Sequence, residues 1–346
     1  MPIRFGLIGC GKITERLALP QLARCRGARV SALIDVDRRA AQRLADRFGI
    51  SRRLIWTDWR RMLREADVDA VAVNVPNALH EELAVAALEA KKHVIVEKPI
   101  ATSLPEADAM IRAARRARRF LMVEQSQRFD PAHEVAHELL RRGRLGRITQ
   151  LRGRIGHAGP RYWSGKRSSW FTERQRSGGG ALMDIGTHIV DLLRWMSGKE
   201  VRRICCGAKT LDRRLSVEDH ASALLEFTDR TLGSFEVCWA TRPYEVSTQA
   251  YGTRGTLRTA FGAARPVVMQ LCRRRGDPNK EESGDRFPAV PPASRLGGAY
   301  PYFARCIATG TQPFISGEEG RATLEVILAA YESARTGSWV TLPLRA

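Results

Sequence analysis

The stretch IRFGLIGCGKIT, residues 3–14, decides how the first part of this 346-residue chain folds. Residues 3–8 are an apolar run of strand length, and Gly9 ends the run. Gly9, Gly11 and Thr14 match the glycine-rich turn that binds a dinucleotide pyrophosphate, with Thr14 in place of the usual third glycine. The first glycine permits a tight turn, and the second lets the backbone approach the phosphates. This stretch predicts a strand, a phosphate-binding turn and a helix.

A second strand, at residues 30–34, is followed directly by Asp35. An acid about 20 residues after the glycine turn binds the adenosine ribose hydroxyls in this kind of fold. Its charge favours NAD, because it repels the 2′-phosphate of NADP. Arg38 and Arg39 follow closely and could accept that phosphate, so NADP is the less favoured alternative. An ordinary turn role for Asp35 also stays open.

Helical and strand-like segments then alternate, which predicts an α/β domain with a doubly wound parallel sheet. We expect helices at 37–48, 80–90 and 103–118, and strands at 68–75, 93–96 and 120–123. Ligands of such sheets bind beyond the carboxyl ends of the strands. The residues at or just past those ends are Gly9, Asp35, Asn74, Glu97 and Lys98.

Lys98 follows a buried strand and precedes a proline, which restricts its backbone. A lysine at the ligand edge can hydrogen-bond a substrate oxygen and stabilise negative charge that develops on it. The alternative is a solvated surface lysine. The chain has only eight lysines, and we therefore favour the functional interpretation.

The stretch SGGGALMDIGTHIVDLLRW, residues 177–195, carries the clearest catalytic pattern. Three glycines precede an apolar helical pattern, and they would let the backbone approach a ligand closely. Asp184 and His188 are four residues apart, so on a helix they share one face. A carboxylate beside an imidazole can orient it and raise its proton affinity, as a general base requires. Two solvated polar residues on an amphipathic helix are the alternative.

The second half of the chain has a different pattern. After a helix at 132–142, strand-like segments separated by turns predict a mainly antiparallel sheet in an α+β domain. We set the domains at 1–125 and 126–346, with a last helix and strand that can pack back near the first domain. Residues 277–292 are polar and rich in Pro and Gly, which predicts a mobile loop. His133 and His137 could form half of a metal site, but no further ligand is evident, so we expect no metal.

Composition limits the class of protein. The net charge of +20 raises nucleic acid as a partner, yet the charge is spread along the chain and 49 of the 57 basic residues are arginine. We therefore expect no specific nucleic-acid binding. Seven scattered cysteines lack CxxC spacing, which favours reduced thiols in a cytoplasm. The sequence has no apolar run of membrane-spanning length and no signal-peptide pattern at its start.

Five segments together resemble the Gfo/Idh/MocA family of oxidoreductases, named for glucose–fructose oxidoreductase, inositol dehydrogenase and a rhizopine-catabolism protein. They are GLIGCGKI at 6–13, VPNALHEELAVAALEAKKHVIVEKPIA at 75–101, QRFDP at 127–131, GGGALMDIGTHIVDLLRW at 178–195 and the tail at 313–343. The resemblance spans both expected domains in the family's order. It implies an N-terminal Rossmann domain and a C-terminal α+β domain with a large open sheet.

The resemblance implies an NAD(H)-dependent oxidoreductase acting on a sugar, inositol or related polyol. Its catalytic set falls on Lys98, Asp184 and His188: His188 exchanges the hydroxyl proton, Asp184 orients His188, and Lys98 binds the reacting oxygen. The Lys98–Pro99 bond is expected to be cis. Implied cofactor contacts are Gly9, Cys10, Gly11, Lys12, Ile13, Asp35, Asn74, Pro76, Asn77, His80, Glu97, Lys98 and Gln127.

Substrate contacts are proposed from aromatic and charged residues, although packing would explain the aromatic ones equally well. They are Arg161, Tyr162, Trp163, Lys166, Trp170 and Tyr300. The chain departs from the family at Trp170-Phe171, where Trp-Arg is usual, and at Ser126-Gln127, where Asn-Arg is usual. The open sheet of the family often forms dimer or tetramer contacts, so we expect a homodimer or homotetramer.

Two alternatives stay open at the level of the sequence. A glycosidase of the same family would use tightly held NAD for transient oxidation and elimination, with no net NADH formed. A non-catalytic ligand sensor on the same fold is the other, because fold does not determine function. The presence of Lys98, Asp184 and His188 together argues against the sensor, which would not need all three.

Overall fold

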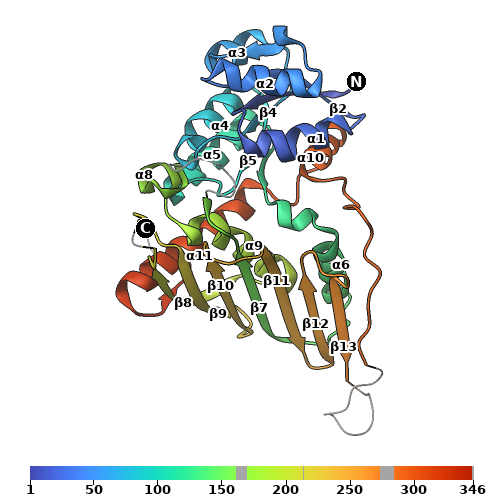
Figure 1. Ribbon diagram of the computed structural model, residues 1–346, viewed down its shortest axis with the longest axis vertical. Coiled ribbons are helices and arrows are strands. Elements are labelled where there is room, and N and C mark those ends of the chain that lie inside the picture. The colour runs from blue at the N-terminus through green and yellow to red at the C-terminus, as the bar shows by residue number, and fades with distance from the viewer. Residues whose placement is uncertain (161–169, 213, 273–283, 345–346) are drawn as a thin grey trace. The chain divides into compact units, whose positions relative to one another are not determined.

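The computed structural model describes residues 1–160, 170–212, 214–272 and 284–344. These residues form two compact units. The first comprises 1–126, 175–178 and 296–324, and the second comprises 127–174, 179–295 and 325–346. Each unit contains one large β-sheet (Figure 1).

The first unit is built on a six-stranded parallel sheet, as the sequence predicts. Its strand order is β3-β2-β1-β4-β5-β6, the order of a doubly wound dinucleotide-binding fold. The strands are β1 Ile3–Ile8, β2 Ala28–Ile34, β3 Ile55–Trp56, β4 Ala70–Val73, β5 His93–Glu97 and β6 Leu121–Glu124. All four residues of both β4 and β6 are buried, as expected for a parallel sheet covered on both faces.

Three of the described helices of this unit begin where the sequence supplies a capping side chain. The carboxylate of Asp37 accepts the N–H of Arg39, and the hydroxyl of Ser103 accepts the N–H of Glu106. A π-helical turn, Thr14–Ala18, leads into α1. The helices are α1 Leu19–Ala23, α2 Arg38–Phe48, α3 Trp59–Glu65, α4 His80–Glu89, α5 Leu104–Ala117 and α10 Ala299–Thr309.

The second unit is built on an eight-stranded sheet of order β13-β12-β11-β7-β10-β9-β8-β14. Its strand pairs are antiparallel except for β7 and β10, which run parallel with Gly156 opposite Cys238. The strands are β7 Ile148–Gly156, β8 Val201–Lys209, β9 His220–Phe227, β10 Leu232–Cys238, β11 Glu245–Gly252, β12 Gly255–Ala260, β13 Val267–Leu271 and β14 Val340–Thr341.

One face of this sheet is covered and the other is open. Along β10 the buried residues Gly233, Phe235 and Val237 alternate with more exposed ones, the pattern of a sheet packed on one side. Figure 1 shows α9 Thr187–Ser197 and α6 Pro131–Arg141 on the same side of these strands, and both helices contact them. Helix α8 Arg174–Ser177 and helix α11 Gly317–Thr336 complete the set of helices described.

A buried ion pair holds α9 to the segment before α6. Nε and Nη2 of Arg128 donate to the two carboxylate oxygens of Asp191 at 2.7 and 2.8 Å, and both side chains are almost fully buried. The guanidinium also lies 5.7 Å from the ring centre of Trp195, on which His137 stacks at 4.0 Å. His137 is thus a packing residue, and no group of metal-ligand side chains occurs among the described residues.

The elements that the sequence analysis does not predict include β3, α8, β13 and α10. Helix α10 places Tyr300 and Phe303 edge-on to Phe5 of β1, so a segment from late in the chain completes the core of the first unit. Of the predicted mobile loop at 277–292, residues 277–283 lie outside the described part. In the rest, Arg286 bridges to Met269 of β13. None of the described helices has the length and apolarity needed to cross a membrane.

Candidate active site

The glycine turn has the geometry that the sequence predicts. Gly9 has φ +95°, and a Cβ there would lie 2.1 Å from the carbonyl oxygen of Asn74, so only glycine fits. Gly11 instead faces open space, with nothing within 4 Å of an added Cβ. Thr14 is fully buried; its hydroxyl donates to the Gly9 carbonyl and accepts from Asn74 Nδ2 at 2.9 Å. Thr14 thus ties the turn to the neighbouring strand.

Asp35 fixes the same turn from the end of β2. Its carboxylate accepts the N–H groups of Cys10 and Asp37, each at 2.8 Å. Burial raises the pKa of the Cys10 thiol to about 12, so this cysteine is neutral in the turn. Lys12 pairs with Glu15 at 2.9 Å, and Ile13 is exposed beside them. The turn is therefore preformed around an open space at Gly11.

The residues after β4 hold the adjoining loops. Asn77 donates to the carbonyl of Ser177 at 2.7 Å. His80 is fully buried; its Nδ1 lies 2.9 Å from the Pro99 carbonyl oxygen and its Nε2 lies 3.0 Å from that of Val75. Burial lowers the pKa of His80, so the ring is neutral. These contacts give His80 a positioning role on both sides of the predicted site.

A buried acidic pair, which the sequence analysis did not single out in full, lies at the ends of β5 and β6. Glu97 and Glu124 are register partners and are 8% and 2% exposed. Burial and the Glu97 carboxylate raise the pKa of Glu124 well above its usual value, although Lys98 opposes the shift. Glu124 Oε1 has no hydrogen-bond partner within the described part of the chain. Burial thus favours the neutral form of Glu124, which lies close to the predicted catalytic lysine.

Tyr300, on α10, lies close to this acidic pair. It is fully buried, and its hydroxyl donates to Asn74 Oδ1 at 3.2 Å. Burial, then Glu97 and Glu124, raise its pKa well above the ordinary value. These contacts favour the packing interpretation of Tyr300 over direct substrate contact. The Lys98–Pro99 bond is cis, as the resemblance implies.

In the second unit, Asp184 lies in a π-helical turn, Leu182–Gly186, that leads into α9. Its carboxylate accepts the indole N–H of Trp239 at 3.2 Å and lies 3.6 Å from His157 Nε2. The N–H of Gly159 donates to His157 Nδ1, which places the proton of the neutral ring on Nε2, toward the carboxylate. His188 follows on α9 and is half-buried. The role of Asp184 in orienting His188 stays a prediction.

Neither His157 nor Trp239 was found from the sequence. Each follows the end of one of the two parallel strands, because His157 comes after β7 and Trp239 after β10. The rule applied to the first domain, that functional side chains gather at the carboxyl ends of parallel strands, could have indicated both residues. They were missed because the second sheet was expected to be mainly antiparallel, with no parallel pair identified within it.

Two of the three glycines before Asp184, Gly179 and Gly180, pack closely against other parts of the protein. The expectation that the three glycines let a ligand approach stays a prediction. A Cβ on Gly180 would lie 1.9 Å from the Glu218 carbonyl oxygen, and one on Gly179 would lie 1.9 Å from the Tyr331 hydroxyl. Oε1 of Glu218 accepts the N–H groups of Gly180 and Leu182 and the hydroxyl of Tyr331, at 2.7–3.0 Å. Glu218 therefore fixes the start of the helix that carries Asp184.

Gln127 and Trp170 lie in the second unit. Gln127 Oε1 is buried and has no hydrogen-bond partner in the described ranges, which suits a residue awaiting a ligand. Trp170 stacks on Phe171 at 3.9 Å. The four substrate candidates Arg161, Tyr162, Trp163 and Lys166 lie outside the described residues.

Comparison with known proteins agrees with this geometry. Residues 3–125 match the model described as "Oxidoreductase family, NAD-binding Rossmann fold", and residues 133–258 match the "GFO/IDH/MocA C-terminal domain". The chain belongs to the Gfo/Idh/MocA oxidoreductase family.

Relatives of known activity cover nearly the whole chain. A 1,5-anhydro-D-fructose reductase of Ensifer adhaerens is 29% identical, over 96% of this chain and 97% of its own. An inositol 2-dehydrogenase of Acidothermus cellulolyticus is 28% identical, over 98% and 94%. Among solved structures, a levoglucosan dehydrogenase in complex with NADH and L-sorbose superposes with a TM-score of 0.86 at 25% identity, covering all of both chains.

Proposed function

We propose that this protein is an NAD(H)-dependent dehydrogenase or reductase acting on a hydroxyl carbon of a sugar, inositol or related polyol. Family membership supplies the oxidoreductase class and the NAD-binding fold. Relatives named as sugar reductases and inositol dehydrogenases supply the substrate class. We assign the cofactor to residues 1–125, and the substrate and assembly to 126–346.

The first unit fits NAD. Gly11 leaves open space beside a turn that Gly9, Asp35 and Thr14 hold in place. We assign the pyrophosphate to the backbone of residues 9–13 and the adenosine ribose to Asp35. Asn74, Pro76, Asn77, His80, Glu97, Lys98 and Gln127 complete the proposed set, with His80 acting through the loops it holds. When bound, NAD accepts or donates a hydride at its nicotinamide ring.

Side chains of the protein transfer the hydroxyl proton. In oxidation His188 removes the hydroxyl proton, and in reduction it returns that proton to the oxygen. Asp184 keeps the imidazole oriented and stabilises its charged form, while Trp239 and His157 hold Asp184. Lys98 binds the reacting oxygen and stabilises the negative charge that develops on it.

The observation that carries this proposal is that Gly9, Asp35, Asn74 and Lys98 stand at or just past the carboxyl ends of four neighbouring parallel strands. Ligands bind at this edge in sheets of this kind. The proposed cofactor-binding turn and the proposed catalytic lysine therefore lie at the same edge of the parallel sheet.

Replacement of the catalytic groups tests the proposal. We expect His188→Ala to lower turnover by about 10²–10⁴-fold, because a general acid–base group contributes about that factor. Lys98→Ala should lower it by about 10²–10³-fold, as loss of one donor to the reacting oxygen does. Steady-state kinetics and NAD titration would show unchanged NAD affinity. Near-normal turnover in both variants would contradict the assignment.

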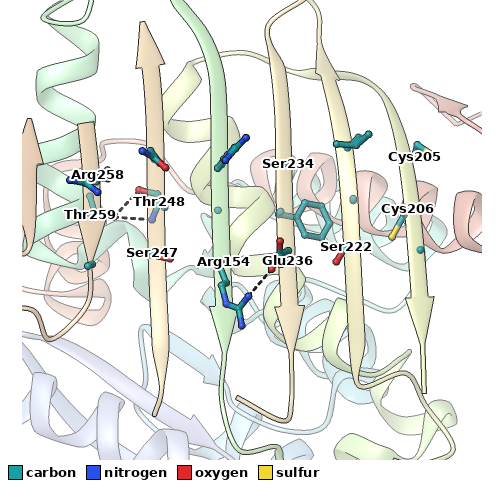
Figure 2. A pocket seen from close by; sticks show the side chains of 18 of the residues that line it. Arg154, Cys205, Cys206, Ser222, Ser234, Glu236, Ser247, Thr248, Arg258 and Thr259 are labelled. Atoms are coloured by element: carbon teal, nitrogen blue, oxygen red, sulfur yellow. Dashed lines mark hydrogen bonds and ion pairs between the residues drawn. The ribbon is translucent and has the colours of Figure 1, made fainter. Parts of the chain in front are cut away.

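We further propose a homodimer or homotetramer formed through the open face of the second sheet, in a cytoplasmic enzyme. A broad groove of about 1020 Å³ crosses this face, lined by side chains such as Arg154, Ser222 and Arg258 (Figure 2). Leu224 on the same face is 56% exposed. All seven cysteines are free thiols, which suits a reducing compartment.

A further inference from the structure

Three side chains at one end of the open sheet face form a cysteine–histidine–aspartate chain. His220 begins β9 and Cys238 ends β10, and the two stand directly opposite each other in the strand register. Cys238 Sγ lies 2.9 Å from His220 Nε2, and His220 Nδ1 lies 2.7 Å from Asp219 Oδ1. A nucleophile next to a base that a third group orients is the arrangement that activates a cysteine.

Asp219 is fixed as an ionised group. Its carboxylate also accepts the N–H groups of Leu211 at 2.8 Å and Asp212 at 2.7 Å. Burial alone would raise the pKa of Asp219, but the hydrogen bonds from His220 and from these two amides lower it overall. An ionised carboxylate on Nδ1 keeps the proton of the neutral ring there, so Nε2 faces the sulfur as an acceptor.

The sulfur also has the surroundings that stabilise a thiolate. The N–H of Ala240 donates to Cys238 Sγ at 3.1 Å, which gives the anion a second hydrogen bond besides that of a protonated His220. Lys209 stands opposite His220 in the neighbouring strand β8. Two acids, Glu236 and Glu245, both pair with Arg154, at 2.7 and 3.0 Å. Figure 2 shows the pair with Glu236. The Ala240 N–H and a protonated His220 are thus the two donors placed to hydrogen-bond an anionic sulfur.

We propose that Cys238 is a nucleophilic modification site that reacts with hydroperoxides. His220 takes the thiol proton, and the thiolate attacks one peroxide oxygen. The S–O bond forms, the O–O bond breaks, and the leaving oxygen takes the proton from His220. With hydrogen peroxide the products are the sulfenic acid of Cys238 and water, because sulfur loses two electrons and the peroxide gains them.

The site is connected to the proposed active site through the backbone. Trp239 follows Cys238, and its indole N–H donates to Asp184. The N–H of His157, the other neighbour of Asp184, donates to the Cys238 carbonyl at 3.0 Å. Oxidation changes the group that accepts the Ala240 N–H, one residue beyond Trp239. We therefore expect oxidation to lower turnover, an expectation that rests on the proposed function.

Labelling of the thiols tests the proposal without any substrate. The purified protein is treated at pH 7 with limiting iodoacetamide, and each cysteine is quantified by peptide mass spectrometry. Cys238 should react about tenfold faster than the exposed Cys272 and than Cys205, which lies on the same open face (Figure 2). Cys205 lies on the same open face as Cys238. A second copy of the chain that covers this face would therefore shield both thiols from iodoacetamide.

His220→Gln should lower the Cys238 rate to that of Cys205, since glutamine cannot take the proton, and Cys205→Ser should leave the rate unchanged. A Cys238 rate no higher than that of Cys205 or Cys272 in the native protein would overturn the proposal, whether or not the variant folds. An unchanged rate in a folded His220→Gln protein would overturn it as well.

A peroxide experiment separates this proposal from the proposed function. Hydrogen peroxide followed by dimedone should label Cys238 and lower NADH-linked turnover about fivefold or more, whereas Cys238→Ser should resist the loss. Labelling of Cys238 in a protein that turns over no polyol would support the site and contradict the enzyme assignment. Turnover of a polyol by a protein whose Cys238 is unreactive would support the enzyme assignment and contradict the modification site.

Discussion

The indole of Trp239 is one of the groups that hold the carboxylate of Asp184. Trp239 is 5% exposed and donates its N–H to Asp184 Oδ2, so a buried carboxylate keeps a fixed direction. We expect Trp239→Phe, which removes the donor and retains the ring, to lower turnover about tenfold and to leave the KM for NAD unchanged, because one hydrogen bond to a charged group is worth about 1.5–3 kcal/mol. Trp339→Phe is the matched control, since Trp339 is 42% exposed. Equal turnover in the two variants would rule out this role.

The raised pKa of Glu124 predicts a pH dependence of stability. Its pKa is raised by burial and by Glu97, so the native state binds a proton that the unfolded chain has released above the ordinary pKa. The free energy of unfolding therefore falls as pH rises from the ordinary pKa toward the raised one. Glu124→Gln is neutral at every pH, and its melting temperature should fall less with rising pH.

Thermal melts between about pH 5 and pH 9 would check this, because that range begins above the ordinary pKa of a glutamate. Glu89→Gln, on the exposed side of α4, should follow the native protein. Parallel melting curves for native protein and Glu124→Gln over the whole range would show that Glu124 is ionised in the fold.

At the scale of single residues, the sequence predicts the residues whose role depends only on neighbours along the chain. Gly9 and Asp35 lie in a motif whose spacing requires them. The structure gives Gly9 the expected backbone and places Asp35 at the expected strand end, while the contact of Asp35 with the ribose stays a prediction. His157, Trp239 and Glu218 depend on which strands and turns become neighbours in space. No spacing along the chain connects Glu218 with Gly180, although Glu218 Oε1 accepts the N–H of Gly180 and the Glu218 carbonyl accepts the N–H of Ala181, each at 2.8 Å.

Among the elements, helix α9 carries one partner of a buried ion pair. Its Asp191 neutralises Arg128 in a site where both side chains are almost fully buried. We expect Asp191→Ala to lower the free energy of unfolding by about 3–5 kcal/mol, the cost of leaving a buried charge without its partner. Urea unfolding followed by circular dichroism measures the change. Glu332→Ala, which breaks an exposed pair with Arg335, should leave stability unchanged; a similar loss in both would contradict the account.

Element boundaries could be predicted where a cap or an uninterrupted pattern marks them. Ser103 and Asp37 begin their helices as the sequence indicates. The π-helical turn at 182–186 could not be predicted, because its apolar spacing is also compatible with an α-helix. Helix α10 was not predicted, although it is as long as α2 and α6, because its apolar side chains contact a strand that lies almost 300 residues earlier in the chain.

At the scale of the whole molecule, the open sheet face predicts assembly. Leu224 is 56% exposed in the middle of this face, where Leu224→Asp would place a charge inside a dimer contact. We expect this variant to lose the assembly at protein concentrations at which the native protein is a dimer or tetramer, because a buried unpaired charge is costly. Light scattering after size exclusion reports the mass. Leu211→Asp, at a 64% exposed leucine outside the sheet, should not change it. A monomeric native protein would refute the assembly.

The central claim is most directly tested by the absorbance of NADH when purified protein, NAD and a panel of sugars and inositols are combined. The account predicts tight NAD binding and NADH formation with at least one polyol, and loss of that signal in His188→Ala. NAD that binds without turnover of any polyol would contradict the dehydrogenase assignment and favour the redox-neutral glycosidase or the sensor. Failure to bind either NAD or NADP would contradict the cofactor site itself.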